Sequence, residues 1–155
     1  MKLECPLMLN ILQGVLLITL VKVQKQVKYV EQYDFEETLP PPEQAEFETA
    51  KYFAGLGKNV SFIKPSSIPN QHRPDIVMDS VEWEIKCPEG NSKRTIENNM
   101  RKALQQAHNV IFDLRHMKYP ENKSIPKLEK EFAINTRLRR LYIIKKSGEL
   151  LTYTR

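Results

Sequence analysis

Six short apolar or alternating segments, separated by turn residues and by helical patterns, constrain the fold of this chain most strongly. Alternation with a period of two is typical of a half-buried strand, whereas apolar residues spaced three and four apart are typical of a helix. The predicted strands are residues 59–63, 75–78, 81–87, 109–114, 138–144 and 150–153, and the predicted helices are residues 43–56, 95–108 and 125–134. This order indicates an α/β fold with a mixed central sheet flanked by helices.

The N-terminal part of the chain differs in composition from the rest. A length of 155 residues suits one domain, which we divide into an apolar segment, residues 1–35, and a main domain, residues 36–155. The apolar run from Pro6 to Val21 spans 16 residues, whereas a membrane-spanning helix needs about 20. We favour one or two strands there over a membrane anchor, because alternation begins at Val21. The charged start and cleavage site of a secretory signal are missing.

Charge and composition narrow the classes of function. Residues 1–92 hold nine Lys and Arg against 13 Asp and Glu, whereas residues 93–155 hold 15 against six. An acidic half beside a basic half is suited to a cation-binding cleft next to a phosphate-binding surface, although basic residues also serve simply to solubilise a domain. Five glycines without a Gly-rich loop argue against a nucleotide-binding fold. Two cysteines cannot by themselves form a structural zinc site.

Three charged residues on two adjacent predicted strands carry the chemistry. If Asp79 and Ser80 form the turn between these strands, Asp75 falls opposite Glu84, with Cβ atoms about 5 Å apart. Carboxylates at that distance repel each other, and a hard divalent cation with oxygen ligands resolves the conflict. Glu84 and Lys86 share one face of the strand, which we expect to be polar and solvent-facing, with Trp83 and its alternate neighbours in the core.

A further carboxylate is expected from the predicted helix 43–56. Its apolar residues gather on one face, and Glu46 lies at the edge of that face, whereas Glu48 lies nearly opposite. A carboxylate on the packing side needs a partner or a cation. We therefore favour Glu46 over Glu48 as a metal ligand or organising residue.

These residues resemble the core of the PD-(D/E)XK nuclease superfamily. The stretch from Glu46 through Arg115 is more narrowly similar to the tRNA-cleaving C-terminal toxin domains of contact-dependent growth-inhibition proteins. The likeness rests on Gly57-Lys58-Asn59-Val60, Pro74-Asp75-Ile76, Trp83-Glu84-Ile85-Lys86-Cys87-Pro88, Thr95-Ile96-Glu97-Asn98-Asn99, Ala103 to Ala107 and Val110-Ile111-Phe112-Asp113-Leu114-Arg115. The first 35 and last 35 residues carry no motif of either family.

The resemblance implies a metal-dependent nuclease of restriction-endonuclease-like fold. Asp75, Glu84 and the Ile85 carbonyl would bind Mg²⁺ or Mn²⁺, Lys86 would position the attacking water, and Glu46 would complete the outer site. The implied substrate is tRNA first and DNA second. The residues expected to contact nucleic acid are Arg94, Asn99, Arg101, Gln106 and Arg115.

The resemblance also implies partners and a place of action. An acidic immunity protein would cover the cleft, and the domain would be delivered as a toxin that acts in the cytoplasm. A membrane is not among the expected partners.

Two alternatives stay open at this point. The first is a DNA endonuclease, or an inactive nucleic-acid-binding accessory protein of a mobile element. The second is a metal-independent ribonuclease that uses His116 as a general acid together with Lys86. The sequence offers His116 no second base. We expect Cys87 to be a packed thiol rather than a nucleophile.

Overall fold

The computed structural model describes residues 42–64, 66, 68 and 71–155. The predicted strands or anchor within residues 1–35, and the proline-rich linker up to residue 41, lie outside the described residues. The helices are α2 (Gln44–Gly55), α3 (Lys93–Gln106) and α4 (Glu121–Ile134), and the strands are β1 (Val60–Phe62), β2 (Ile76–Met78), β3 (Val81–Lys86), β4 (Asn109–Asp113), β5 (Arg140–Ile144) and β6 (Leu150–Thr154). Among these helices, none is both long and apolar enough to cross a membrane.

The six strands form one mixed sheet, in the spatial order β1-β2-β3-β4-β5-β6. The pairs β1/β2, β2/β3 and β5/β6 are antiparallel, whereas β3/β4 and β4/β5 are parallel. Parallel neighbours need a long crossover connection, and α3 and α4 supply the two that are required here. The predicted mixed sheet flanked by helices is therefore confirmed.

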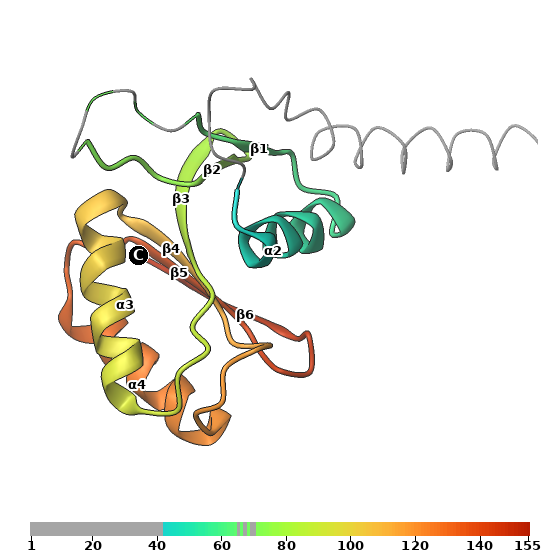
Figure 1. The fold of residues 1–155 in the computed structure, drawn as a ribbon. Coiled ribbons are helices and arrows are strands. Elements are labelled where there is room, and N and C mark those ends of the chain that lie inside the picture. Colours follow the sequence, from blue (N-terminus) through green and yellow to red (C-terminus); the bar gives the residue numbers. More distant parts are fainter. Residues whose placement is uncertain (1–41, 65, 67, 69–70) are drawn as a thin grey trace, which may run out of the picture.

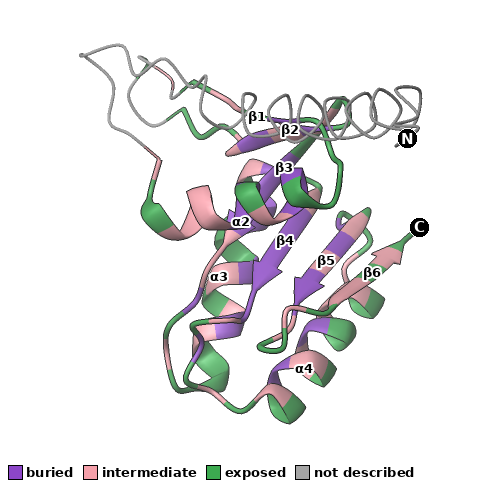
Figure 2. Cartoon of the chain, turned by 90° about the vertical axis from the view of Figure 1, so that its right-hand side faces the viewer, coloured by how far each residue is buried: buried purple, intermediate pink, exposed green. Residues whose placement is uncertain are grey.

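Helices cover both faces of the sheet and create two apolar cores. Figure 1 shows α3 and α4 together on one side of the sheet and α2 on the other. The α3–α4 core includes Ile96, Met100, Val110, Phe112, Leu128 and Leu141. The α2 core includes Ala50, Phe53, Ile76, Trp83, Ile85 and Ile111. The central strands are consequently buried on both faces, while the outer faces of the helices are exposed (Figure 2).

The turn between β2 and β3 has the geometry that the sequence predicts. Met78 pairs with Val81, so Asp79 and Ser80 are the two turn residues. Both have positive φ, 49° for Asp79 and 66° for Ser80. This is the signature of a type I′ turn, whose twist matches that of the strands it joins. The Asp79 carboxylate accepts hydrogen bonds from the Asn59 backbone N–H (3.1 Å) and from Lys58 Nζ (2.9 Å), which hold the turn in place.

The stop of helix α2 is formed at Gly57, the glycine that the sequence predicts for it; the last helical residue is Gly55. Gly57 has a φ of 84° and donates to the Ala54 carbonyl, while Lys58 N–H donates to the Phe53 carbonyl. These two hydrogen bonds form the Schellman arrangement, which satisfies carbonyls that the last turn would otherwise leave without donors. The stop returns the chain directly to the sheet as β1.

Most of the predicted element boundaries lie within two residues of the observed ones, and the start of α4 differs by four. Helix α4 begins at Glu121 rather than at residue 125, because the N–H groups of Lys123 and Ser124 already bond to the Pro120 carbonyl. Pro126 lies in the second turn, where it lacks the N–H that would bond to the carbonyl of residue 122. Strand β5 begins at Arg140 rather than at residue 138, since Leu138 N–H instead donates to the Asn135 carbonyl in a turn.

Candidate active site

The backbone of Asp75 is fixed by strands on both sides. Its N–H donates to the Trp83 carbonyl (3.0 Å), and its carbonyl accepts from the Ile63 N–H (2.9 Å). The register of β2 and β3, continued by one residue, sets Asp75 opposite Glu84 as predicted. The Asp75 carboxylate crosses to β3, where its Oδ2 accepts from the Ile85 N–H at 2.7 Å. The hairpin therefore holds Asp75 against the strand that carries Glu84.

Glu84 lies on a face of β3 that is buried, which corrects the expectation of a solvent-facing polar face. Its neighbour in the sheet is Val110 of β4, a residue of the α3–α4 core. An interior strand between two helical layers has no free face, and the side chain of Glu84 is accordingly 1% exposed. Lys86, whose side chain is 16% exposed, forms an ion pair with Glu84 Oε1.

The second carboxylate oxygen of Glu84 is an orphan. Oε2 is buried and has no hydrogen-bond donor among the described residues, and the neighbouring Asp75 carboxylate can share a hydrogen bond with Glu84 only if one of the two carries a proton. A buried oxygen of this kind costs free energy unless a proton or a cation reaches it. Burial, and then the negative charge of Asp75, raise the pKa of Glu84 to about 8 against the opposing effect of Lys86. Burial also raises the pKa of Asp75.

Glu46 reaches the same group of charges from helix α2. Burial, and then the negative charge of Asp75, raise the pKa of Glu46 to about 7, while the charge of Lys86 acts in the opposite direction. Its Oε2 also accepts from the Glu43 N–H at 3.3 Å, as half of a capping box that begins α2. Asp75, Glu84 and Lys86 therefore lie together, and Glu46 is near enough to Asp75 and Lys86 for their charges to change its pKa.

Glu48 lies in a different environment from Glu46. It accepts a hydrogen bond from Gln44 at 3.1 Å, and its Oε2 lies 3.5 Å from His116 Nε2. The hydrogen bond from Gln44 is the largest cause that lowers the pKa of Glu48. His116 therefore has a carboxylate partner, although the sequence pattern offered it none.

Asp75 and Glu84 supply some, but not all, of the oxygen ligands that a divalent cation needs. Oxygen ligands are the preference of Mg²⁺, which is held in proteins through one or two carboxylates and keeps several waters. Asp75 and the orphan oxygen of Glu84 supply two such groups, and the Ile85 carbonyl is a further candidate. In the part of the chain that the structure describes, no group of three or more His, Cys, Asp or Glu side chains is arranged to hold a metal ion. A cation here would therefore need backbone and water ligands as well.

Sequence reasoning missed one buried polar cluster around Asp113, which lies beside the carboxyl ends of β3 and β4. Asp113, 2% exposed, ends β4. Its carboxylate accepts from Thr49 Oγ1 at 2.7 Å and from Arg115 Nε at 2.9 Å. Burial acts to raise the pKa of Asp113, but the hydrogen bonds from Arg115 and Thr49 together outweigh it and lower that pKa. An acidic residue at the end of an apolar strand was the available signal.

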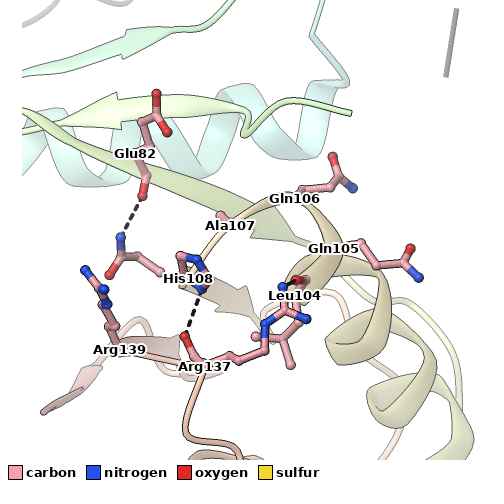
Figure 3. A pocket seen from close by; sticks show the side chains of 9 residues that line it. Glu82, Leu104, Gln105, Gln106, Ala107, His108, Arg137 and Arg139 are labelled. Carbon is pink, nitrogen blue, oxygen red and sulfur yellow. Dashed lines mark hydrogen bonds between the residues drawn. The ribbon is translucent and has the colours of Figure 1, made fainter. Parts of the chain in front are cut away.

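The residues predicted to contact nucleic acid fall in separate places. Arg115 holds Asp113 at the carboxyl ends of the parallel strands, whereas Gln106 lines a hollow of about 310 Å³ at their amino ends (Figure 3). Arg101, which is exposed, lines an adjoining hollow between α3 and α4. Asn99 is half-buried and donates to the Thr95 carbonyl at 2.7 Å, and Arg94 is exposed at the start of α3.

Hydrogen-bonding contacts connect the residues that line the hollow beside Gln106. Arg137 Nη2 donates to the Leu104 carbonyl at 3.2 Å, and the Arg137 carbonyl lies 3.0 Å from His108 Nδ1. Arg139 also lines this hollow (Figure 3). Glu82, which lines this hollow, lies two residues before Glu84 on β3, which is about 7 Å along a strand. None of Asp75, Glu84 and Lys86 lines the hollow.

Comparisons with known proteins connect this geometry to a family. A solved structure of a CdiA-CT/CdiI toxin and immunity complex from Burkholderia pseudomallei matches the fold with a TM-score of 0.57 at 16% sequence identity, covering 76% of this chain and 95% of that chain. A search of curated proteins finds no match. The family model of the contact-dependent growth inhibition CdiA C-terminal domain matches residues 72–150, about half of the chain, including Asp75, Glu84 and Lys86. The chain therefore belongs to the CdiA C-terminal toxin domains of contact-dependent growth inhibition.

Proposed function

We propose that this toxin domain is a metal-dependent nuclease of the PD-(D/E)XK type, which hydrolyses phosphodiester bonds of nucleic acid. The observation that carries the proposal is the orphan Oε2 of Glu84, buried beside Asp75 and with its partner oxygen paired to Lys86. Burying a carboxylate oxygen without a donor lowers the stability of the fold unless a proton or a cation binds to it, so the arrangement does not stabilise the fold by itself. It is well suited to holding Mg²⁺ or Mn²⁺ through oxygen ligands.

The roles of the residues follow from their positions. Asp75, Glu84 and the Ile85 carbonyl would hold the cation, which supplies an activated water and stabilises negative charge on the phosphate. Lys86 Nζ orients the attacking water or steadies the developing charge on a phosphate oxygen. Glu46, whose raised pKa makes it a proton acceptor near neutral pH, completes the outer part of the site.

The substrate proposed first is tRNA, and DNA second. The support is the excess of basic residues over residues 93–155, together with the exposed Arg94 and Arg101 and the polar hollow beside Gln106. Phosphate contacts by arginine and lysine supply most of the affinity of proteins for nucleic acid, without selecting a sequence.

The decisive experiment incubates the protein with total RNA and with plasmid DNA in Mg²⁺. Glu84→Gln removes the charge that would hold the cation, and we expect it to slow cleavage by about a hundred-fold or more. Glu129→Gln is the control, because Glu129 is exposed on α4 and lines neither the carboxylate cluster nor the hollow beside Gln106; we expect it to cleave like the wild type. Chelation by EDTA should abolish cleavage. Equal cleavage by wild type and Glu84→Gln, or none by the wild type, would contradict the proposal.

A second candidate function is favoured by the contact between His116 and Glu48. An exposed histidine oriented by a carboxylate can act as a general acid or base, and these side chains lie 3.5 Å apart. A ribonuclease of this kind needs no metal ion. Cleavage that persists in EDTA and is lost in His116→Gln would support it over the metal-dependent reaction.

The domain is also proposed to act in the cytoplasm of a target cell and to be neutralised by an acidic immunity protein. The similar solved structure is a toxin and immunity complex, and an acidic surface complements the basic half of this chain. Expressed without such a partner, the wild type should arrest the growth of its host, and Glu84→Gln should not. Unimpaired growth with the wild type would contradict this proposal.

A further inference from the structure

Thr49 and Asp113 are buried polar residues to which the proposed reaction gives no part. Thr49 is fully buried on α2, and Asp113 is 2% exposed at the end of β4. The Thr49 hydroxyl has one proton, which it shares between Asp113 Oδ2 at 2.7 Å and the Ala45 carbonyl at 2.9 Å. The bond to a charged acceptor is the shorter and the stronger of the two. It joins elements 64 residues apart in the sequence.

Cys87 extends this connection to the end of β3. Its Sγ lies 3.4 Å from Thr49 Oγ1. Because Thr49 donates its single proton to Asp113, the Cys87 thiol is the donor of this contact. Cys87 directly follows Lys86, and the contacts of Thr49 therefore connect α2 with the ends of both β3 and β4.

Arg115 completes the group from the far side of Asp113. Its Nε lies 2.9 Å from Asp113 Oδ1 and 3.0 Å from Oδ2, and its guanidinium lies over the ring of Tyr52 on α2, 5.5 Å from the centroid. The Tyr52 hydroxyl in turn donates to the Gly148 carbonyl at 2.8 Å. The negative charge that Thr49 meets is thus compensated and fixed in position, as a buried charge must be.

These contacts give α2 a directional connection that its apolar packing lacks. Ala50 and Phe53 bury apolar surface, and that effect is non-directional. A hydrogen bond to a fixed carboxylate constrains both the rotation of the helix and its position along the sheet. Thr49 lies three residues after Glu46, so the two side chains are on neighbouring positions of the helix surface, with Cβ atoms about 5–6 Å apart.

We propose that Thr49 and Asp113 are positioning residues, which fix helix α2, and with it Glu46, relative to the ends of β3 and β4. This inference rests on the proposed nuclease function, because it assigns the purpose of the contact to the placement of Glu46. Neither residue touches the reacting atoms. We expect the effect of Thr49 on the reaction to pass through Glu46.

The test compares Thr49→Val with Thr49→Ser in the full chain. Valine has the shape of threonine without the hydroxyl, whereas serine keeps it. We expect Thr49→Val to lower kcat for nucleic acid cleavage about ten-fold, with KM unchanged, since small misplacements of a catalytic group cost rate. Thr49→Ser should stay close to the wild type. Thr152→Val, at an exposed threonine of β6, controls for the substitution itself.

A double variant separates positioning from general loss of stability. If Thr49 acts through Glu46, Thr49→Val should have no further effect on kcat in a Glu46→Gln background. Independent, multiplicative losses would overturn the inference. So would wild-type kcat in Thr49→Val.

Hydrogen exchange tests the placement without any need for activity. The backbone amides at the start of α2, around Glu46, should exchange faster in Thr49→Val and in Asp113→Asn than in Thr49→Ser. Equal protection in all three would overturn the inference even if the wild type does not cleave nucleic acid. An inactive wild type with the expected exchange pattern would instead contradict only the nuclease proposal.

Discussion

At the scale of single residues, the charge of Asp113 has a measurable effect on stability. Because the pKa of Asp113 is lowered in the folded protein, its ionised form stabilises the fold above the unfolded pKa of about 3.9. That contribution is lost as pH falls through the folded pKa. Arg115 remains charged throughout, and the thiol of Cys87 remains neutral at acid and neutral pH.

Asp113→Asn should therefore lower the free energy of unfolding by about 1–3 kcal/mol at neutral pH, since it weakens buried hydrogen bonds to a charged group. Urea unfolding of both proteins between pH 2 and pH 7 measures the difference. We expect this difference to be constant above about pH 5 and to shrink below about pH 4. A difference that grows as the solution becomes acidic would contradict the assignment.

At the scale of elements, the turn between β2 and β3 stores a small strain. Ser80 has a φ of 66°, a conformation that glycine adopts without penalty and that serine does not. Ser80→Gly should raise the free energy of unfolding by about 0.5–1 kcal/mol. Thermal unfolding measures this change. Ser61→Gly, within β1, is the contrasting control and should lower stability by a similar amount, because glycine weakens a strand.

The same turn explains why part of the site could be predicted from the sequence. A two-residue turn fixes the register of its strands, so placing Asp79 and Ser80 in the turn also placed Asp75 opposite Glu84. The spacing of apolar residues likewise put Glu46 at the edge of the packing face of α2. These are local relations, in which a few neighbouring residues determine the geometry.

At the scale of the whole molecule, the relations that sequence reasoning missed depend on distant partners. The burial of Glu84 follows from the parallel pairing of β3 with β4 and from the helices of the α3–α4 core. The contact between Thr49 and Asp113 joins residues that no periodic pattern relates. Local periodicity predicts which residues share a face of a helix or strand, but it does not predict which distant segments cover that face.

The enclosure of Glu84 also determines how anything from solvent can meet its carboxylate. Sheet neighbours and the helical layer close off the breadth of β3, and the side chains that remain partly open beside Glu84 are Lys86 and Asp75. A group that approaches the buried carboxylate from solvent must therefore pass between one cationic and one acidic side chain. A metal ion and the phosphate that it accompanies would each meet a side chain of opposite charge on that path.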